Sequence, residues 1–95
     1  MNQELKNSIN AYVSLLPDMY SSPNDDYRLM RIAYEFETTE ARFDDELKSF
    51  FVDTLSQKFK DYSKEFIVEF YQERKKQIES FAYVIGGLKT MNLLK

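Results

Sequence analysis

A stretch of 62 residues, from Asn24 to Ile85, contains neither glycine nor proline. Tight turns between β-strands depend on glycine, and only two glycines and two prolines occur in the whole chain of 95 residues. Apolar side chains recur at helical spacing through the stretch. They are Phe36, Phe43, Leu47, Phe50, Phe51, Leu55, Phe59, Tyr62, Phe66, Phe70, Ile78, Phe81 and Ile85. We therefore expect an all-α fold, a small antiparallel bundle of three to four helices with a long helical C-terminal half.

A single helix over this stretch would be about 90 Å long and would leave its apolar side in water. The chain must therefore fold back on itself or pair with another copy. Thr38-Thr39 and Asp61-Tyr62-Ser63 are the best candidates for breaks, because Ser, Thr and Asp side chains compete for backbone hydrogen bonds. We expect one domain over residues 1–95, with helices near 2–16, 23–37, 39–60 and 62–85. Continuity of the second helix with the third, or of the third with the fourth, stays open.

The ends of the expected helices carry recognisable signals. Pro17 cannot continue the first helix, because it lacks an N–H and its ring clashes with the preceding turn. Ser22 and Pro23 suit the cap and the first position of the second helix. Gly86-Gly87 predicts the end of the last helix, since glycine adopts the left-handed cap conformation. A short apolar tail over residues 88–95 would then follow.

The chain lacks the side chains on which most enzymes and metal sites depend. It has no cysteine and no histidine, which removes disulfides, thiolate chemistry and the usual zinc ligands. We expect no catalytic residues, no cofactor and no metal. The N-terminus lacks the pattern of a signal peptide, and no apolar run approaches the ~20 residues needed to span a bilayer. We expect a cytoplasmic protein of a bacterial or host cell that does not contact membranes.

Charge is divided unevenly along the chain. Residues 24–53 carry nine acids and four bases, whereas residues 54–95 carry eight bases and five acids. One interpretation is that antiparallel helices complement each other, and the other is that the acidic part is a binding surface. Ordered carboxylates of this kind can also imitate the phosphates of DNA. The candidate acidic contacts are Glu35, Glu37, Glu40, Asp44 and Asp45.

Eight phenylalanines and seven tyrosines are more than a small core buries easily. The adjacent pairs Phe50-Phe51 and Phe70-Tyr71 project to different sides of their helices, so one ring of each pair should face away from the core. Surplus aromatic side chains are typical of protein interfaces. Phe51, Tyr71 and Tyr83 therefore join the candidate partner contacts.

These features together predict a non-enzymatic protein-binding module that acts through an aromatic and acidic helical face on a partner of unknown identity. The composition resembles that of small bacterial and phage accessory proteins, such as inhibitors, immunity proteins and adaptors. One alternative is a self-assembling structural helical protein, with a homodimer as the simplest case. A second is a nucleic-acid-associated regulator using the basic stretch Lys58-Lys76. Nucleic acid is the less expected partner because the chain is acidic, with a pI near 4.9.

Overall fold

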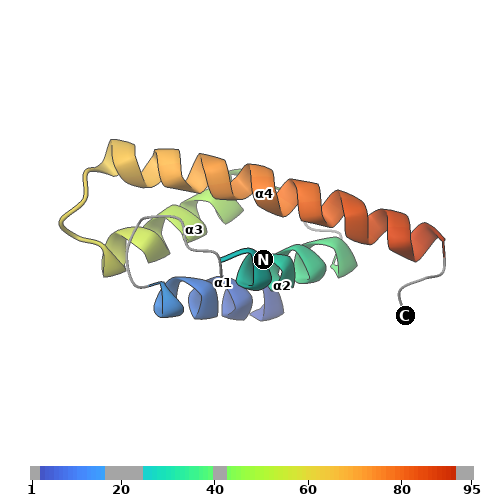
Figure 1. The fold of residues 1–95 in the computed structure, drawn as a ribbon. Helices are drawn as coiled ribbons and strands as arrows, with labels where there is room; N and C mark the ends of the chain where they lie inside the picture. Colours follow the sequence, from blue (N-terminus) through green and yellow to red (C-terminus); the bar gives the residue numbers. More distant parts are fainter. Residues whose placement is uncertain (1–2, 17–24, 40–42, 92–95) are drawn as a thin grey trace.

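Four α-helices, and no β-strand, form the part of the chain that the computed structural model describes, residues 3–16, 25–39 and 43–91 (Figure 1). The all-α expectation is confirmed. The helices are α1 (Gln3–Leu15), α2 (Asp25–Thr38), α3 (Asp45–Lys58) and α4 (Lys64–Thr90). α2 ends at Thr38, and residues 59–63 separate α3 from α4, so both expected breaks lie where helices end. The signals at Pro17, Ser22 and Pro23 fall outside the described residues.

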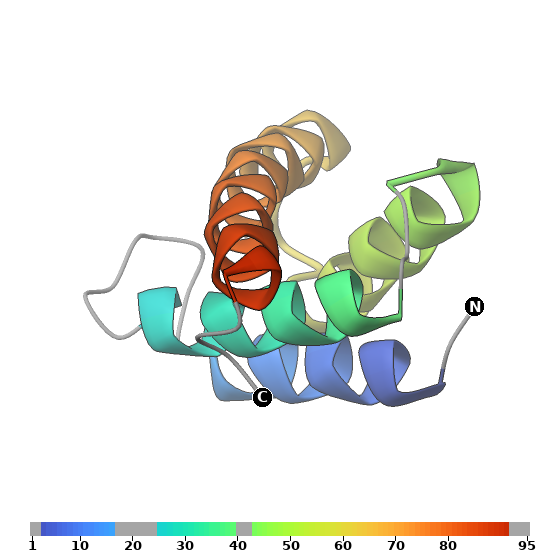
Figure 2. The same ribbon diagram turned by 90° about the vertical axis from the view of Figure 1, so that its right-hand side faces the viewer.

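The helices form two antiparallel hairpins, α1 with α2 and α3 with α4 (Figure 1). Figure 2 shows α1 and α2 side-on while α4 points towards the viewer, so the two hairpins cross. α2 also packs on α4, and α1 packs on α3. Each helix therefore contacts two others around a shared interior. Of the described helices, none combines the length and the apolar character needed to cross a membrane.

Aromatic rings fill the centre of this interior. The Phe51 ring lies edge-on to Tyr12 of α1, with centroids 6.2 Å apart, and edge-on to Tyr71 of α4, at 5.6 Å. Aliphatic side chains of all four helices surround these rings, including Ile9, Leu29, Leu55 and Ile78, among others. Phe51 of α3 thus contacts Tyr12 of the first hairpin and Tyr71 of its own hairpin, and so links the two hairpins.

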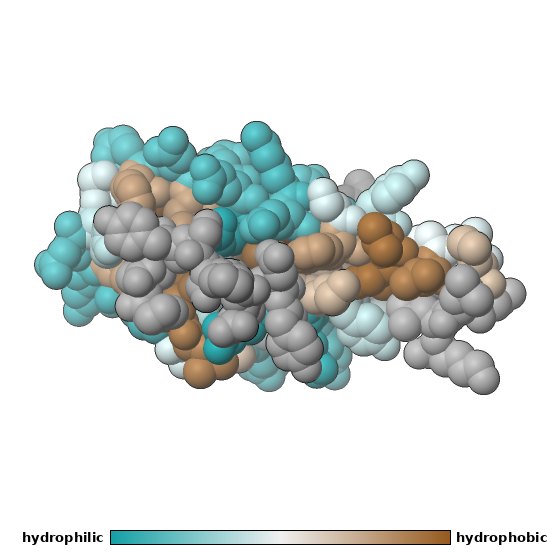
Figure 3. Space-filling view, in the orientation of Figure 1, coloured by the Kyte–Doolittle hydropathy of each residue, from teal (hydrophilic) through white to brown (hydrophobic). Residues whose placement is uncertain are grey.

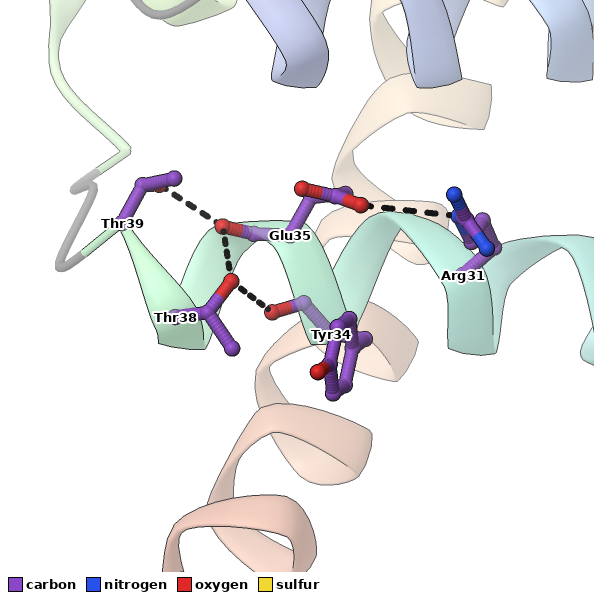
Figure 4. A network of polar contacts seen from close by, with 5 residues as sticks. All are labelled: Arg31, Tyr34, Glu35, Thr38 and Thr39. Carbon is purple, nitrogen blue, oxygen red and sulfur yellow. Dashed lines mark hydrogen bonds and ion pairs between the residues drawn. The ribbon is translucent and has the colours of Figure 1, made fainter. Parts of the chain in front are cut away.

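Side-chain hydrogen bonds explain why helices end without glycine. At the end of α2, the Thr39 hydroxyl donates to the Glu35 carbonyl at 2.7 Å and the Thr38 hydroxyl donates to the Tyr34 carbonyl at 2.9 Å (Figure 4). Asp44 caps α3 by accepting from the Leu47 N–H at 2.9 Å. These bonds satisfy backbone groups that a helix terminus leaves without an intrahelical partner.

The end of α1 is closed by a side chain from another helix. The Lys58 ammonium of α3 donates to the carbonyls of Val13 at 2.7 Å, Ser14 at 2.8 Å and Leu16 at 2.6 Å. Carbonyls in the last turn of a helix lack N–H partners, and a positive charge there is favourable. Lys58 therefore both caps α1 and links it to α3.

Replacing Lys58 by methionine should lower the free energy of unfolding by about 1–2 kcal/mol, because the carbonyls lose a charged donor while the aliphatic stem is kept. Urea denaturation followed by circular dichroism measures the change. Lys60→Met removes a nearby exposed charge and should have little effect. Equal losses in the two variants would contradict the capping role.

The expected helix end at Gly86-Gly87 is wrong, because α4 continues through both glycines to Thr90. Leu88 therefore belongs to the helix rather than to a tail, and residues 92–95 lie outside the described part. Gly86 lies close to a side chain of α2. A Cβ atom at this position would lie 2.9 Å from Oε1 of Glu37. Gly86 therefore does not end the helix, and a side chain at this position would require the Glu37 carboxylate to move.

The two glycines should respond differently to alanine. A Cβ at Gly87 meets nothing within 4 Å, so Gly87→Ala should raise the free energy of unfolding by about 0.5–1 kcal/mol through helix propensity. Gly86→Ala should gain less, since the Glu37 carboxylate must move. Thermal and urea unfolding of the matched pair measure both changes. An equal gain in the two variants would show that the Glu37 contact imposes no constraint.

Candidate functional site

Two of the predicted partner contacts lie in the core. Phe51 is 0% exposed and Tyr71 is 2% exposed, so the expectation that these rings face away from the core is wrong. Because α3 and α4 each pack against two other helices, the buried sector of each is wider than a single stripe. It is wide enough on α4 to bury the adjacent Phe70 and Tyr71 together.

The predicted acidic residues do not share one helical face. Glu35 is buried on α2, with its Oε1 3.5 Å from Nε of Arg31 (Figure 4). Glu37 is half-buried beside Gly86. Asp44 and Asp45 are exposed at the start of α3, where Asp44 acts as the cap. Glu40 lies outside the described residues.

Carboxylates therefore point in several directions around the junction between α2 and α3. Within residues 3–16, 25–39 and 43–91, no three carboxylates come close enough together to hold a metal ion.

The projecting end of α4 carries three exposed apolar side chains, including the two most exposed among the described residues, Tyr83 and Met91. Tyr83 is 84% exposed, Val84 54% and Met91 66%. Val84, Leu88 and Met91 follow one another at spacings of four and three, so they line one side of the helix, here called the α4 strip. Figure 1 shows α4 extending past the end of α2, and Figure 3 shows hydrophobic surface along this half of α4. Tyr83 is one of the predicted partner contacts, whereas no residue of the α4 strip is among them.

Tyr83 lies on another side of α4 among carboxylates. Glu79 precedes it by one helical turn. Gly86 follows it by one turn, and the Glu37 carboxylate of α2 lies against Gly86. We call these three residues, Glu37, Glu79 and Tyr83, the Tyr83 face.

The pKa of Tyr71 is raised above its ordinary value of 10.0, first by burial and then by the charges of Glu79 and Asp44. The folded state thus keeps the phenol protonated at a pH where the unfolded chain releases the proton. The resulting stabilisation is complete below about pH 10 and is lost as the pH rises through 10 towards the folded pKa.

Tyr71→Phe should remove this pH dependence. The unfolding free energy of the wild type minus that of the variant should decrease as the pH rises from about 9 to about 11. Urea denaturation at each pH measures it. A difference that stays constant over the range would contradict the raised pKa.

Two bases of the stretch Lys58-Lys76 are engaged by other parts of the chain. The Lys58 ammonium contacts the end of α1. Arg74 is buried, its Nε donates to the Tyr12 hydroxyl at 3.0 Å, and its guanidinium lies 4.2 Å from the Phe70 ring centroid. These two charges are not available to phosphates, which reduces the basic surface that the stretch offers.

A groove of about 510 Å³ lies between α1 and α2 on another part of the surface. Its polar lining combines the charges of Glu4, Arg28, Arg31 and Glu35, and Leu15 is exposed beside them. The charges of both signs favour no single ligand chemistry. No family model matches the chain, and no curated protein and no solved structure has significant similarity to it.

Proposed function

We propose that the chain is a non-enzymatic protein-binding module, of the inhibitor, immunity or adaptor type, that docks through the C-terminal half of α4. The observation that carries the proposal is the exposure of Tyr83, Val84 and Met91 on a helix end that projects beyond its neighbours. Aromatic side chains and methionine are enriched at protein interfaces, and exposed apolar patches mark contact sites.

Docking through these side chains is energetically favourable because leaving them in water is costly. Complete burial of a side chain of this size is worth roughly 1.5–3 kcal/mol. Tyr83, Val84 and the rest of the α4 strip can together supply several kcal/mol on docking, which helps to offset the entropy lost on association. The acidic residues of the Tyr83 face flank this surface and would add electrostatic selectivity.

Site-specific photo-crosslinking tests the proposal. Val84→p-benzoylphenylalanine should give one discrete adduct in lysate of the organism that encodes the chain. The same residue at Leu15, an exposed apolar position on α1, should not give this adduct. The captured protein, once identified and purified, should bind the wild type in a saturable manner.

Two double variants complete the test. Val84→Ser/Met91→Ser should weaken binding of the captured protein by at least about tenfold. The control Leu15→Ser/Met30→Ser changes two exposed apolar residues on α1 and α2 and should leave the affinity unchanged. An adduct of the chain with itself would favour the self-assembling alternative. Equal affinities in the two double variants would overturn the proposed surface.

A further inference from the structure

The Tyr83 face combines an open aromatic ring with carboxylates on both sides along the helix. Tyr83 is among the most exposed side chains described, with Glu79 one turn before it and the Glu37 carboxylate one turn after it. We infer that this face binds an arginine side chain of the partner protein, with the guanidinium stacked on the Tyr83 ring and paired with Glu79 or Glu37. The inference rests on the proposed function, because it names the chemistry of that partner.

The carboxylates of this face are not neutralised within the described part of the chain. No basic side chain of residues 3–16, 25–39 and 43–91 forms an ion pair with Glu37 or Glu79. Lys75 and Lys76 both lie one turn before Glu79. The Lys75 ammonium is placed 5.7 Å from the centroid of the Phe43 ring, and the exposed Lys76 forms no ion pair with Glu79. The face therefore attracts a cation.

The aromatic ring makes arginine the expected cation. A guanidinium is planar, stacks on aromatic faces and donates several hydrogen bonds towards carboxylates at the same time. An ammonium group is a compact charge that loses more hydration on the same ring. A metal ion would require several carboxylates gathered at one point, and the described carboxylates are too far apart for that. An exposed aromatic ring beside carboxylates therefore suits a guanidinium.

The apolar strip next to this face explains why the cation should belong to a protein. Val84, Leu88 and Met91 occupy a different side of the same helix end. A partner that encloses the end of α4 would cover the strip with apolar side chains while an arginine at the rim reaches Tyr83. Interfaces are commonly built this way, with an apolar centre and a charged rim that includes arginine.

The test uses the whole chain and two short peptides, one alternating alanine with arginine and the other alternating alanine with lysine. Nuclear magnetic resonance titration at low ionic strength measures the affinity and shows which amide signals move. The arginine peptide should bind about two- to fivefold more tightly, the ratio expected from stacking at an exposed ring, and should move the signals around Tyr83 and Glu79.

Two sets of variants separate stacking from general charge attraction. Tyr83→Leu should reduce the arginine-to-lysine ratio to about one. Glu37→Gln/Glu79→Gln should weaken both peptides more than Glu65→Gln/Glu69→Gln, which makes the same charge change at exposed sites near the start of α4. Equal binding of the two peptides, or a ratio that Tyr83→Leu leaves unchanged, would overturn the inference. That result would leave the Val84 crosslink standing, so the two proposals fail separately.

Discussion

Replacing Phe51 by alanine is expected to lower the free energy of unfolding by about 3–5 kcal/mol, the range for removing a buried phenylalanine. The ring is 0% exposed and lies edge-on to Tyr12 and Tyr71. Its loss removes apolar burial, leaves a cavity where the two hairpins meet, and breaks both ring contacts. A small domain has only about 5–15 kcal/mol of total stability, so this variant should be close to unfolding at room temperature.

Phe66→Ala is the matched control. Phe66 lies on α4, is partly exposed and stacks on Tyr62 with ring centroids 5.2 Å apart. Its replacement should cost about 1 kcal/mol, the ordinary value for a substitution outside the core. Urea denaturation of both variants, or thermal unfolding if Phe51→Ala is too unstable for urea, measures the difference. Similar losses in the two variants would show that Phe51 is not the centre of the interior.

The helix pattern could be predicted from the sequence because local chemistry determines it. The recurrence of apolar residues gave the fold class, and the polar side chains at Thr38-Thr39 and Asp61-Tyr62-Ser63 marked both breaks. In the structure, the threonines bond to carbonyls at the end of α2. The Ser63 hydroxyl accepts from the Phe66 N–H at the start of α4. Interactions between residues three or four positions apart can be predicted from a sequence.

Contacts between distant residues could not be predicted in the same way. Gly86 looked like a helix end because its closeness to Glu37 depends on how α2 and α4 pack. Phe51 and Tyr71 looked surplus because the sequence shows one apolar stripe, whereas each helix has two neighbours in the fold. Lys58 looked like part of a basic stretch, although its partners are about 40 residues away on α1.

The candidate surface was therefore only partly predictable. Tyr83 was identified from its residue type and position, and its exposure agrees with that role. Val84 and Met91 could have been found by noting that they lie off the buried line of Ile78, Ala82 and Ile85 on the same helix. For Met91 this spacing is informative only once the helix is known to continue past Gly87.

Replacing Arg74 by methionine is expected to lower the free energy of unfolding by about 1.5–3 kcal/mol, the range for a hydrogen bond to a charged group. Arg74 is buried, donates to the Tyr12 hydroxyl at 3.0 Å and stacks on Phe70. The carboxylate of Glu73 lies 3.9 Å from its Nη1 and is mostly exposed. Methionine keeps most of the volume but leaves the Tyr12 hydroxyl without this donor in the core. Lys76→Met, an exposed change on the same helix, should stay within about 0.5 kcal/mol of the wild type.

A double-mutant cycle with Tyr12→Phe decides how this loss arises. Tyr12→Phe alone leaves the buried guanidinium without the hydroxyl acceptor, so it should also be costly. In Arg74→Met/Tyr12→Phe both polar groups are gone, and the combined loss should be smaller than the sum of the two single losses by about 0.5–3 kcal/mol. Urea denaturation of the four proteins measures this coupling. Additive losses would mean that Arg74 stabilises the fold through its contact with the Phe70 ring and through the packing of its own aliphatic stem. A strong coupling would mean that the pair stabilises the fold mainly through the hydrogen bond between Arg74 and Tyr12, which joins α4 to α1 across the interior.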